Sequence, residues 1–343
     1  MTATPWRVAF RADAGTDIGL GHVRRCLTLA GALRELGIES LFAFAGDARA
    51  REWLEASDFE VLPVEPTHDL AGTLEHCRVH QARVIVVDSP SLGTAYLTAL
   101  SAAGLRVVVI DDLADHELPV DLVVNARAGA ARLPYRGAPR TRFLLGPRYV
   151  LLRSQFGQAG TRSVPDRARR ILVTVGGGDP GDLTSRLVGW ATRALGAVEQ
   201  DVVVGPFTVR REALRVAVES AGGRVVLHED PKDIAALMLA ADMALCGGGQ
   251  TAYELAATGT PALAIRLAEN QTLNLTALAK AGTLAWVGDA GDADLEAKIG
   301  PALAGLADDP MRRARMCRQG RALVDGRGAG RVARAVADLG AAG

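Results

Sequence analysis

Cysteine is scarce in this 343-residue chain and follows no recognisable spacing. Its four cysteines, Cys26, Cys77, Cys246 and Cys317, form no C-x-x-C pair. Their scatter argues against a disulfide framework and favours a reducing compartment. The first residues lack the basic start and apolar stretch of a signal peptide, so we expect a cytoplasmic protein.

Neither sign of charge is in excess, and long apolar runs are missing. Lys+Arg and Asp+Glu both number 39, so no overall field draws the chain to nucleic acid or to an anionic membrane. No apolar run approaches the length of a membrane span. We therefore expect no nucleic-acid partner and no membrane span. The sequence leaves the oligomeric state open.

The chain does contain a repeated alternation of short apolar runs and helix-patterned segments. Runs such as 84–87, 106–110 and 171–175 are rich in Val and Ile, which is typical of parallel strands covered on both faces. The alternation stops after 125 and resumes near 170. We predict an α/β protein with two doubly wound, Rossmann-like domains facing across a cleft. Their expected ranges are 1–160 and 169–320, followed by a C-terminal helix over 321–343.

A glycine-rich loop follows the first predicted strand, Trp6–Arg11. The segment Gly19-Leu20-Gly21-His22 leads into a helix predicted over about Val23–Leu36. Glycines let backbone amides approach a ligand, and the helix N-terminus favours negative charge. His22 would then lie beside a bound anion, which suits a general base. The alternative is a histidine that starts the helix and bonds only to backbone.

Two more glycine-rich loops are expected in the second half. Gly176-Gly177-Gly178 follows the strand that starts at Arg170, and Gly247-Gly248-Gly249 follows the strand Met243–Leu245. Either loop could hold an oxyanion through backbone amides, whereas a plain tight turn would need fewer glycines. The expected binding place is the carboxyl ends of the strands.

Polar residues follow the second of these loops. Thr251 could cap the next helix or bind phosphate through its hydroxyl. Glu254 could complete a capping box with Thr251 or accept two hydroxyls of a ribose. A capping box does not require three preceding glycines, so we favour the ribose. Asn270 and Gln271, after the strand 262–267, form either a turn with a helix cap or a hydrogen-bonding set for sugar hydroxyls.

Two other nucleotide motifs are excluded. A dinucleotide fingerprint needs glycine at position 24, where the chain has Arg24. No Gly-Lys-Ser/Thr P-loop is present.

Together these segments resemble the UDP-2,4-diacetamido-2,4,6-trideoxy-beta-L-altropyranose hydrolase family of pseudaminic acid biosynthesis and its relatives in spore-coat polysaccharide loci. That group is itself similar to GT-B glycosyltransferases, above all the UDP-GlcNAc-dependent transferase of peptidoglycan synthesis. The resemblance covers nearly the whole chain. The matching segments are Arg11-Ala12-Asp13-Ala14, Ile18–Leu27, Leu145–Arg153, Gly176–Pro180, Gly248–Glu254 and Ala268–Gln271.

The resemblance implies a GT-B fold and a role for each matched residue. His22 would be catalytic, and no metal or cofactor would be required. The nucleotide-sugar substrate, expected to be a UDP-sugar, would be held by two sets of residues. The nucleotide and diphosphate set is Gly21, Gly177, Gly178, Gly248, Gly249, Gln250, Thr251 and Glu254; the sugar set is Asp13, Asp88, Asn270 and Gln271.

The chain departs from the family at one point. The family has a tyrosine two residues after the aspartate that corresponds to Asp88, and this chain has Pro90 there. The sugar is therefore left open.

The activity expected from the resemblance is hydrolysis of the nucleotide sugar, with His22 taking a proton from water. A glycosyltransferase using a small-molecule acceptor is the alternative. A catalytically silent nucleotide-sugar sensor is a third possibility.

Overall fold

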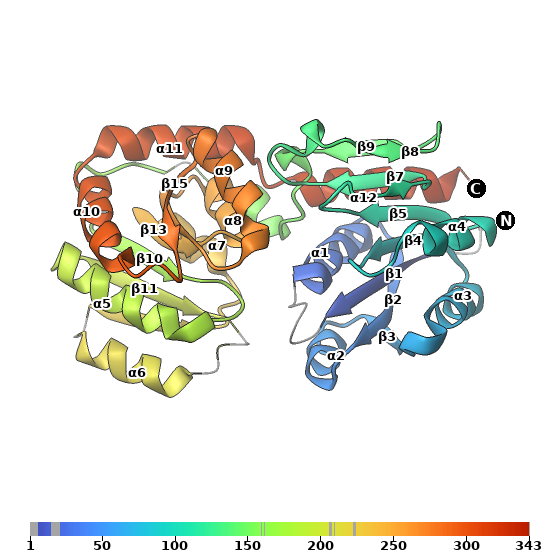
Figure 1. Ribbon diagram of the computed structural model, residues 1–343, viewed down its shortest axis with the longest axis horizontal. Coiled ribbons are helices and arrows are strands. Elements are labelled where there is room, and N and C mark those ends of the chain that lie inside the picture. The colour runs from blue at the N-terminus through green and yellow to red at the C-terminus, as the bar shows by residue number, and fades with distance from the viewer. Residues whose placement is uncertain are drawn as a thin grey trace. The chain divides into compact units, whose positions relative to one another are not determined.

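The computed structural model describes residues 6–14, 21–158, 160, 162–205, 208, 210–221 and 224–342. The chain forms two compact units (Figure 1). The first unit consists of Met1–Ser154 and Arg327–Gly343, and the second unit of Gln155–Gly326. The chain thus leaves the first unit once and returns to it at the end.

The first unit is built on a seven-stranded parallel sheet of order β3-β2-β1-β4-β5-β7-β9. Because β1 pairs with β2 on one side and β4 on the other, the direction of winding reverses beside β1. Doubly wound sheets bind ligands at such a reversal, beyond the carboxyl ends of the strands. The strands are β1 Arg7–Ala14, β2 Glu39–Gly46, β3 Glu60–Pro63, β4 Ala82–Asp88, β5 Arg106–Ile110, β7 Leu122–Asn125 and β9 Arg142–Leu145; β6 Glu117–Leu118 and β8 Arg136–Gly137 form a small separate pair.

Helices cover both faces of this sheet. α1, α2 and α12 share one apolar core with the strands, and α3 and α4 share the core on the other face. Figure 1 shows α12, the red end of the chain, among the blue and green elements of the first unit. These helices are α1 Gly21–Glu35, α2 Ala48–Glu55, α3 Asp69–Val79, α4 Thr94–Ala102 and α12 Gly328–Ala341.

The second unit repeats the plan with a six-stranded parallel sheet of order β12-β11-β10-β13-β14-β15. Its winding reverses beside β10, which again places a candidate binding edge at the carboxyl ends of the central strands. The strands are β10 Arg170–Thr174, β11 Glu199–Val204, β12 Val225–Glu229, β13 Met243–Gly247, β14 Ala262–Arg266 and β15 Leu284–Asp289.

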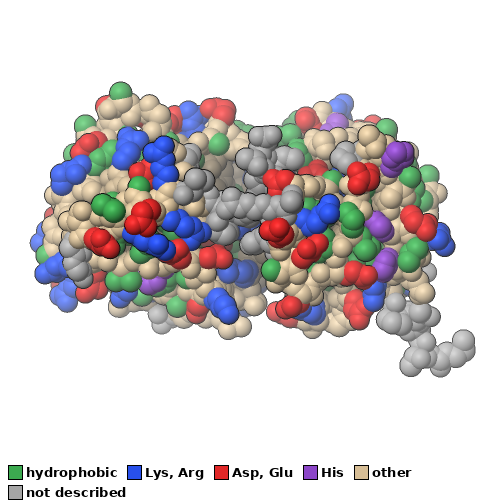
Figure 2. Space-filling view, turned by 90° about the horizontal axis from the view of Figure 1, so that it is seen from below, with side chains coloured by type: hydrophobic (Ala, Val, Ile, Leu, Met, Phe, Trp, Pro, Cys, Tyr) green, Lys and Arg blue, Asp and Glu red, His purple; other side chains and the backbone are tan. Residues whose placement is uncertain are grey.

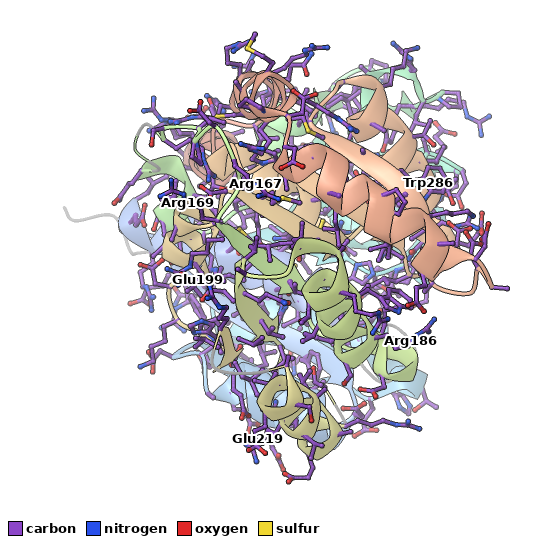
Figure 3. All side chains as sticks on the ribbon, turned by 90° about the vertical axis from the view of Figure 1, so that its left-hand side faces the viewer. Arg167, Arg169, Arg186, Glu199, Glu219 and Trp286 are labelled. Carbon is purple, nitrogen blue, oxygen red and sulfur yellow. The ribbon has the colours of Figure 1, made fainter. Side chains whose placement is uncertain are left out.

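The second sheet is also covered by helices. α5, α6 and α10 contribute to one core, while α7, α8 and α9 pack against the strands and α11 packs on α8. In the view of Figure 3, Arg186 on α5, Glu219 on α6 and Trp286 on β15 lie at the outside of this unit. The helices are α5 Leu183–Leu195, α6 Arg211–Ser220, α7 Ile234–Ala240, α8 Gln250–Thr258, α9 Thr272–Lys280, α10 Leu295–Ala307 and α11 Pro310–Leu323.

The predicted α/β class with two parallel, doubly wound sheets is confirmed. The segment after 125, which lacks a clear sequence period, contributes the edge strand β9 to the first sheet. The units change at Ser154 and Gly326, whereas the sequence analysis places its boundaries at 160, 169 and 320. The end of the chain completes the first core because Val332, Ala333 and Val336 of α12 are buried in it.

The surface carries both signs of charge. In Figure 2, basic and acidic side chains lie interspersed over the visible face, as expected from equal totals of the two. Within the described ranges, no helix combines the length and the apolar character needed to cross a membrane.

Close packing of α12 predicts an asymmetry between two glycines of that helix. A methyl group on Gly328 would lie 2.3 Å from the carbonyl oxygen of Val150, whereas one on Gly330 would meet nothing within 4 Å. We expect Gly328→Ala to lower the free energy of unfolding by about 2 kcal/mol. Gly330→Ala, the matched control, should be neutral or stabilising by up to about 1 kcal/mol. Urea denaturation measures both, and equal effects would contradict the packing.

Candidate functional site

The carboxyl edge of the first sheet carries a row of polar side chains. Asp13 lies near the end of β1, Asp88 ends β4, Asp111 and Asp112 follow β5, and Asn125 ends β7. Parallel strands bring these chain-distant residues to one edge. α1 begins at the same edge, because it follows β1 directly in the chain.

His22 is the second residue of α1 and is held by Asp88. Its Nδ1 lies 2.6 Å from Asp88 Oδ1. The Asp88 side chain is completely buried, while 22% of the His22 side chain is exposed. His22 therefore has one side anchored in the protein and another side open to solvent.

Asp88 is ionised because Arg25 is its partner. Arg25 Nε donates to Asp88 Oδ2 at 2.5 Å, and Nη2 donates to Oδ1 at 2.6 Å. Burial alone would raise the pKa of Asp88, but the Arg25 charge and the hydrogen bonds from Arg25 and His22 outweigh it and lower that pKa to about 2. The buried Cys26 thiol lies 3.6 Å from Asp88 Oδ2. Burial and this carboxylate raise the pKa of Cys26 well above its usual value.

The ionised carboxylate determines the tautomer of His22. An ionised aspartate can only accept hydrogen bonds, so the short contact requires the imidazole proton to be on Nδ1. The neutral ring then has its lone pair on Nε2, and among the described residues nothing hydrogen-bonds to that atom. A histidine with a free Nε2 can accept a proton from a nucleophile.

Asp13 lies in a separate buried network. Arg11 Nη1 donates to Asp13 Oδ1 at 2.5 Å, and Ser91 Oγ lies 3.5 Å from Asp13 Oδ2. Arg11 is itself fixed by Asp69, whose carboxylate also accepts a 2.6 Å hydrogen bond from the Tyr96 hydroxyl. Within the described ranges, the contact to Asp13 Oδ2 is this long one from Ser91.

The glycine-rich loops of the second unit come together at the carboxyl edge of its sheet. A methyl group on Gly176 would lie 3.7 Å from Thr251 Oγ1, so the loop after β10 lies against the start of α8. Gly205, which follows β11, fits against Gly177 so closely that a methyl group would lie 2.6 Å from the Gly177 Cα. The loops that follow β10, β11 and β13 therefore lie next to one another at the carboxyl edge of this sheet.

The N-terminus of α8 has no side-chain cap. Gly249 occupies the N-cap position without a side-chain hydrogen bond, and Thr251 is the second residue of the helix. The possibility that Thr251 caps the helix is wrong, and with it the capping box with Glu254. The N-cap glycine thus supplies no side-chain acceptor at the N-terminus of α8, and a helix N-terminus favours a bound anion.

Residues after β14 support the same loop. Gln271 Oε1 accepts a hydrogen bond from the Leu267 amide at 2.9 Å, and its Nε2 faces Gly249. Asn274 is buried on α9 and donates from Nδ2 to the Gly248 carbonyl at 2.7 Å. Asn270 is exposed on the short turn Glu269–Gln271.

The structure therefore groups the candidate residues into two sets. In the first unit, Gly21, His22 and Asp88 meet at one edge, but Asp88 is fully buried and bonded to His22 and Arg25. Both of its oxygens accept hydrogen bonds from these two residues, and its expected sugar contact stays a prediction. In the second unit, the structure gathers Gly177, Gly178, Gly248, Gly249, Gln250, Thr251, Glu254, Asn270 and Gln271 at the ends of β10, β13 and β14.

Three supporting residues were not predicted from the sequence. Their contacts are with distant parts of the chain. Arg25 bonds to Asp88, 63 positions away, and Asn274 bonds to Gly248, 26 positions away. Gly205 packs against Gly177 of a neighbouring loop. A basic residue one helical turn after His22 is the available signal for Arg25. Gly19 and Leu20 lie outside the described residues. Within the described ranges, no group of three or more His, Cys, Asp or Glu side chains is arranged to hold a metal ion.

Comparison with solved structures defines the fold. Acinetobacter baumannii MurG superimposes with a TM-score of 0.66 at 16% identity, over 97% of this chain and 99% of that one. The spinosyn rhamnosyltransferase SpnG in complex with thymidine diphosphate gives 0.65 at 16% identity, over 96% and 100%. The S. aureus MnaA complex with UDP gives 0.60 at 13% identity, over 95% and 94%. The chain therefore has the GT-B fold.

Curated relatives give a more particular likeness. The Bacillus subtilis spore coat polysaccharide biosynthesis protein SpsG is 25% identical over 97% of this chain and 98% of its own length. An uncharacterized protein of Methanocaldococcus jannaschii is 22% identical over 76% of this chain, which spans 55% of that protein. A Salinibacter ruber UDP-N-acetylglucosamine–N-acetylmuramyl-(pentapeptide) pyrophosphoryl-undecaprenol N-acetylglucosamine transferase is 39% identical over 24% of this chain and 23% of its own. No family model matches the chain.

The lowered pKa of Asp88 predicts how stability depends on pH. Its folded-state pKa of about 2 lies below the usual 3.8, so the stabilisation is complete above pH 5 and is lost as the pH falls through the range between the two values. The full contribution is about 2 kcal/mol, and about half of it should remain at pH 3.

Urea unfolding of the wild type and of Asp88→Asn at pH 7, 5 and 3 measures this contribution. The difference in unfolding free energy between the two proteins should stay constant from pH 7 to 5 and shrink toward pH 3. A difference that does not change with pH would contradict the ionised state of Asp88.

Proposed function

We propose that this protein is a glycosyl-transferring enzyme that uses a nucleoside-diphosphate sugar as donor and passes the sugar to a hydroxyl or amine acceptor. The observation that carries the proposal is the His22–Asp88 pair at the reversal point of a GT-B domain. It is anchored on Nδ1, and no described residue hydrogen-bonds to Nε2 of the partly exposed ring. The GT-B fold and the similarity to a polysaccharide biosynthesis protein along nearly the whole chain support it.

His22 would act as the general base. The acceptor oxygen or nitrogen attacks the anomeric carbon and forms the new glycosidic bond, while its proton passes to His22 Nε2. The bond between the anomeric carbon and the diphosphate oxygen breaks, and its electron pair leaves with the diphosphate. Asp88 holds the ring in the tautomer that can accept this proton and stabilises the imidazolium that forms.

The second unit would hold the leaving diphosphate. Negative charge grows on it as the bond breaks. The positive end of the α8 dipole, behind a glycine N-cap, would stabilise that charge together with the backbone amides of Gly177, Gly178, Gly248 and Gly249. Thr251 would add its hydroxyl, and Glu254 would take the ribose. UDP is the expected nucleotide; related folds are known in complex with UDP and with thymidine diphosphate.

The sugar itself would contact Asp13, Asn270 and Gln271. Among the residues that the structure describes, Ser91 contacts Asp13 Oδ2 at 3.5 Å, which leaves that oxygen able to accept a further hydrogen bond from a sugar hydroxyl. Gln271 has its oxygen engaged by Leu267, so its Nε2 is the group offered toward Gly249. Asp88 would act through His22.

Hydrolysis is the second candidate function. His22 Nε2 could take a proton from water as readily as from an acceptor, and the motifs that carry His22 resemble those of the pseudaminic acid pathway hydrolase. Incubation with UDP-, dTDP-, CDP- and GDP-sugars followed by mass spectrometry separates the two activities. A glycoside plus nucleotide supports transfer, free sugar plus nucleotide supports hydrolysis, and binding of every donor without turnover would refute both.

His22→Gln should abolish most turnover and leave nucleotide binding unchanged. The base contributes on the order of 10²- to 10⁴-fold to the rate, whereas it makes no contact that the nucleotide is proposed to need. Turnover assays and calorimetric UDP titration measure the two effects. His68→Gln, an exposed histidine of the same unit, is the control. Normal turnover of His22→Gln would remove the assignment.

Asn274→Leu should weaken nucleoside-diphosphate binding about tenfold, because the lost hydrogen bond to the Gly248 carbonyl no longer fixes the loop. Thr276→Leu, at an exposed position of α9, is the matched control and should bind normally. If both variants bind UDP like the wild type, the loop after β13 is not the diphosphate site.

A further inference from the structure

We propose that Arg25 is the positioning residue of the catalytic pair: it fixes the Asp88 carboxylate and balances its charge, so that His22 takes a proton and gives it up again. This inference rests on the proposed function of His22. Nothing in the comparisons assigns a role to Arg25.

Arg25 lies one helical turn after His22 on α1, so both side chains project from the same face of the helix. Its guanidinium uses all three nitrogens. Nε and Nη2 hold the two oxygens of Asp88, and Nη1 donates to Asp112 Oδ2 at 2.9 Å. The guanidinium fork thus fixes the carboxylate in orientation, which a single contact from a lysine could not do.

Arg25 and Asp88 favour different protonation states of the same imidazole nitrogen, Nδ1 of His22. Arg25 Nη2 lies 3.2 Å from His22 Nδ1, and as a pure donor it could bond only to an unprotonated Nδ1. Asp88 Oδ1, a pure acceptor at 2.6 Å, requires a protonated Nδ1. The contact with Asp88 is the shorter one and determines that Nδ1 is protonated. Arg25 therefore acts on His22 indirectly, by fixing Asp88.

Among the described groups linked to His22, the charges balance before it is protonated. Asp112 Oδ1 also lies 3.3 Å from Arg127 Nε, which completes the chain His22–Asp88–Arg25–Asp112–Arg127. Two carboxylates and two guanidinium groups cancel, and the neighbouring Cys26 thiol is neutral because burial raises its pKa. A proton on His22 is therefore the single uncompensated charge of this cluster. A carboxylate without a paired cation would instead stabilise protonated His22, which cannot act as a base.

Opposite charge changes at the two sides of this chain should shift the pH dependence in opposite directions. Arg25→Gln leaves one carboxylate in excess and favours protonated His22, so the acid limb of the kcat/KM profile should move up by roughly one pH unit. Asp112→Asn leaves one cation in excess, so the limb should move down. Arg34→Gln, at an exposed position near the end of the same helix, should leave the profile unchanged.

Arg25→Lys separates charge from geometry. It keeps the cation and loses the fork, so the pH limb should stay near that of the wild type while kcat falls at least tenfold and KM changes little. This variant and Asp112→Asn carry the test if Arg25→Gln does not fold.

The ring of His22 can be followed by ¹⁵N NMR in the protein without substrate, which keeps this test independent of the proposed activity. The Nδ1-protonated signature is expected in the wild type, with midpoints that move up in Arg25→Gln and down in Asp112→Asn. Shifts in the same direction, or none, would overturn the role of Arg25. Correct NMR shifts in a protein that turns over no nucleotide sugar would retain that role and overturn the proposed function instead.

Discussion

The buried carboxylate of Asp88 is the constraint around which the first unit's polar edge is organised. It joins the start of α1 to the end of β4, and Arg25 extends the connection to the loops after β5 and β7. A buried ion that loses a partner is costly, typically several kcal/mol. The geometry of the candidate base is thereby tied to the integrity of four elements, and none of them can move alone without breaking a charged contact.

The sequence was sufficient for the strand–helix order, the glycine-rich loops of the second unit and the place of His22 at the start of a helix, because each of these is encoded within a short stretch of chain. The role of Asp88 was not predictable in this way. It depends on β4 pairing directly beside β1, in a register that sets Asp88 next to Ala12, and 63 residues separate it from Arg25. The packing of α12 against the first sheet was not predictable either, because the pattern of an amphipathic helix does not indicate which sheet the helix covers.

Glycine has two different uses in the second unit, and sequence alone does not distinguish them. Gly249 forms the N-cap of α8 without a side-chain hydrogen bond to the helix. Gly205 and Gly247 instead allow chain segments to approach: a methyl group would lie 2.6 Å from the Gly177 Cα in the first case and 2.9 Å from the Val175 carbonyl oxygen in the second. The glycine content of this edge thus serves loop packing, and the packing brings the candidate binding loops together.

The placement of α12 has a consequence for biogenesis. The ribosome releases the seven strands of the first sheet long before it makes the helix that covers part of one face, and all of the second unit is synthesised in the interval. The nascent first unit must wait with uncovered aliphatic surface beside Leu29 and Leu33, whereas the second unit has its full complement of elements as it emerges. Vectorial synthesis therefore favours maturation in the reverse of chain order, and it gives chaperones a defined window in which to act.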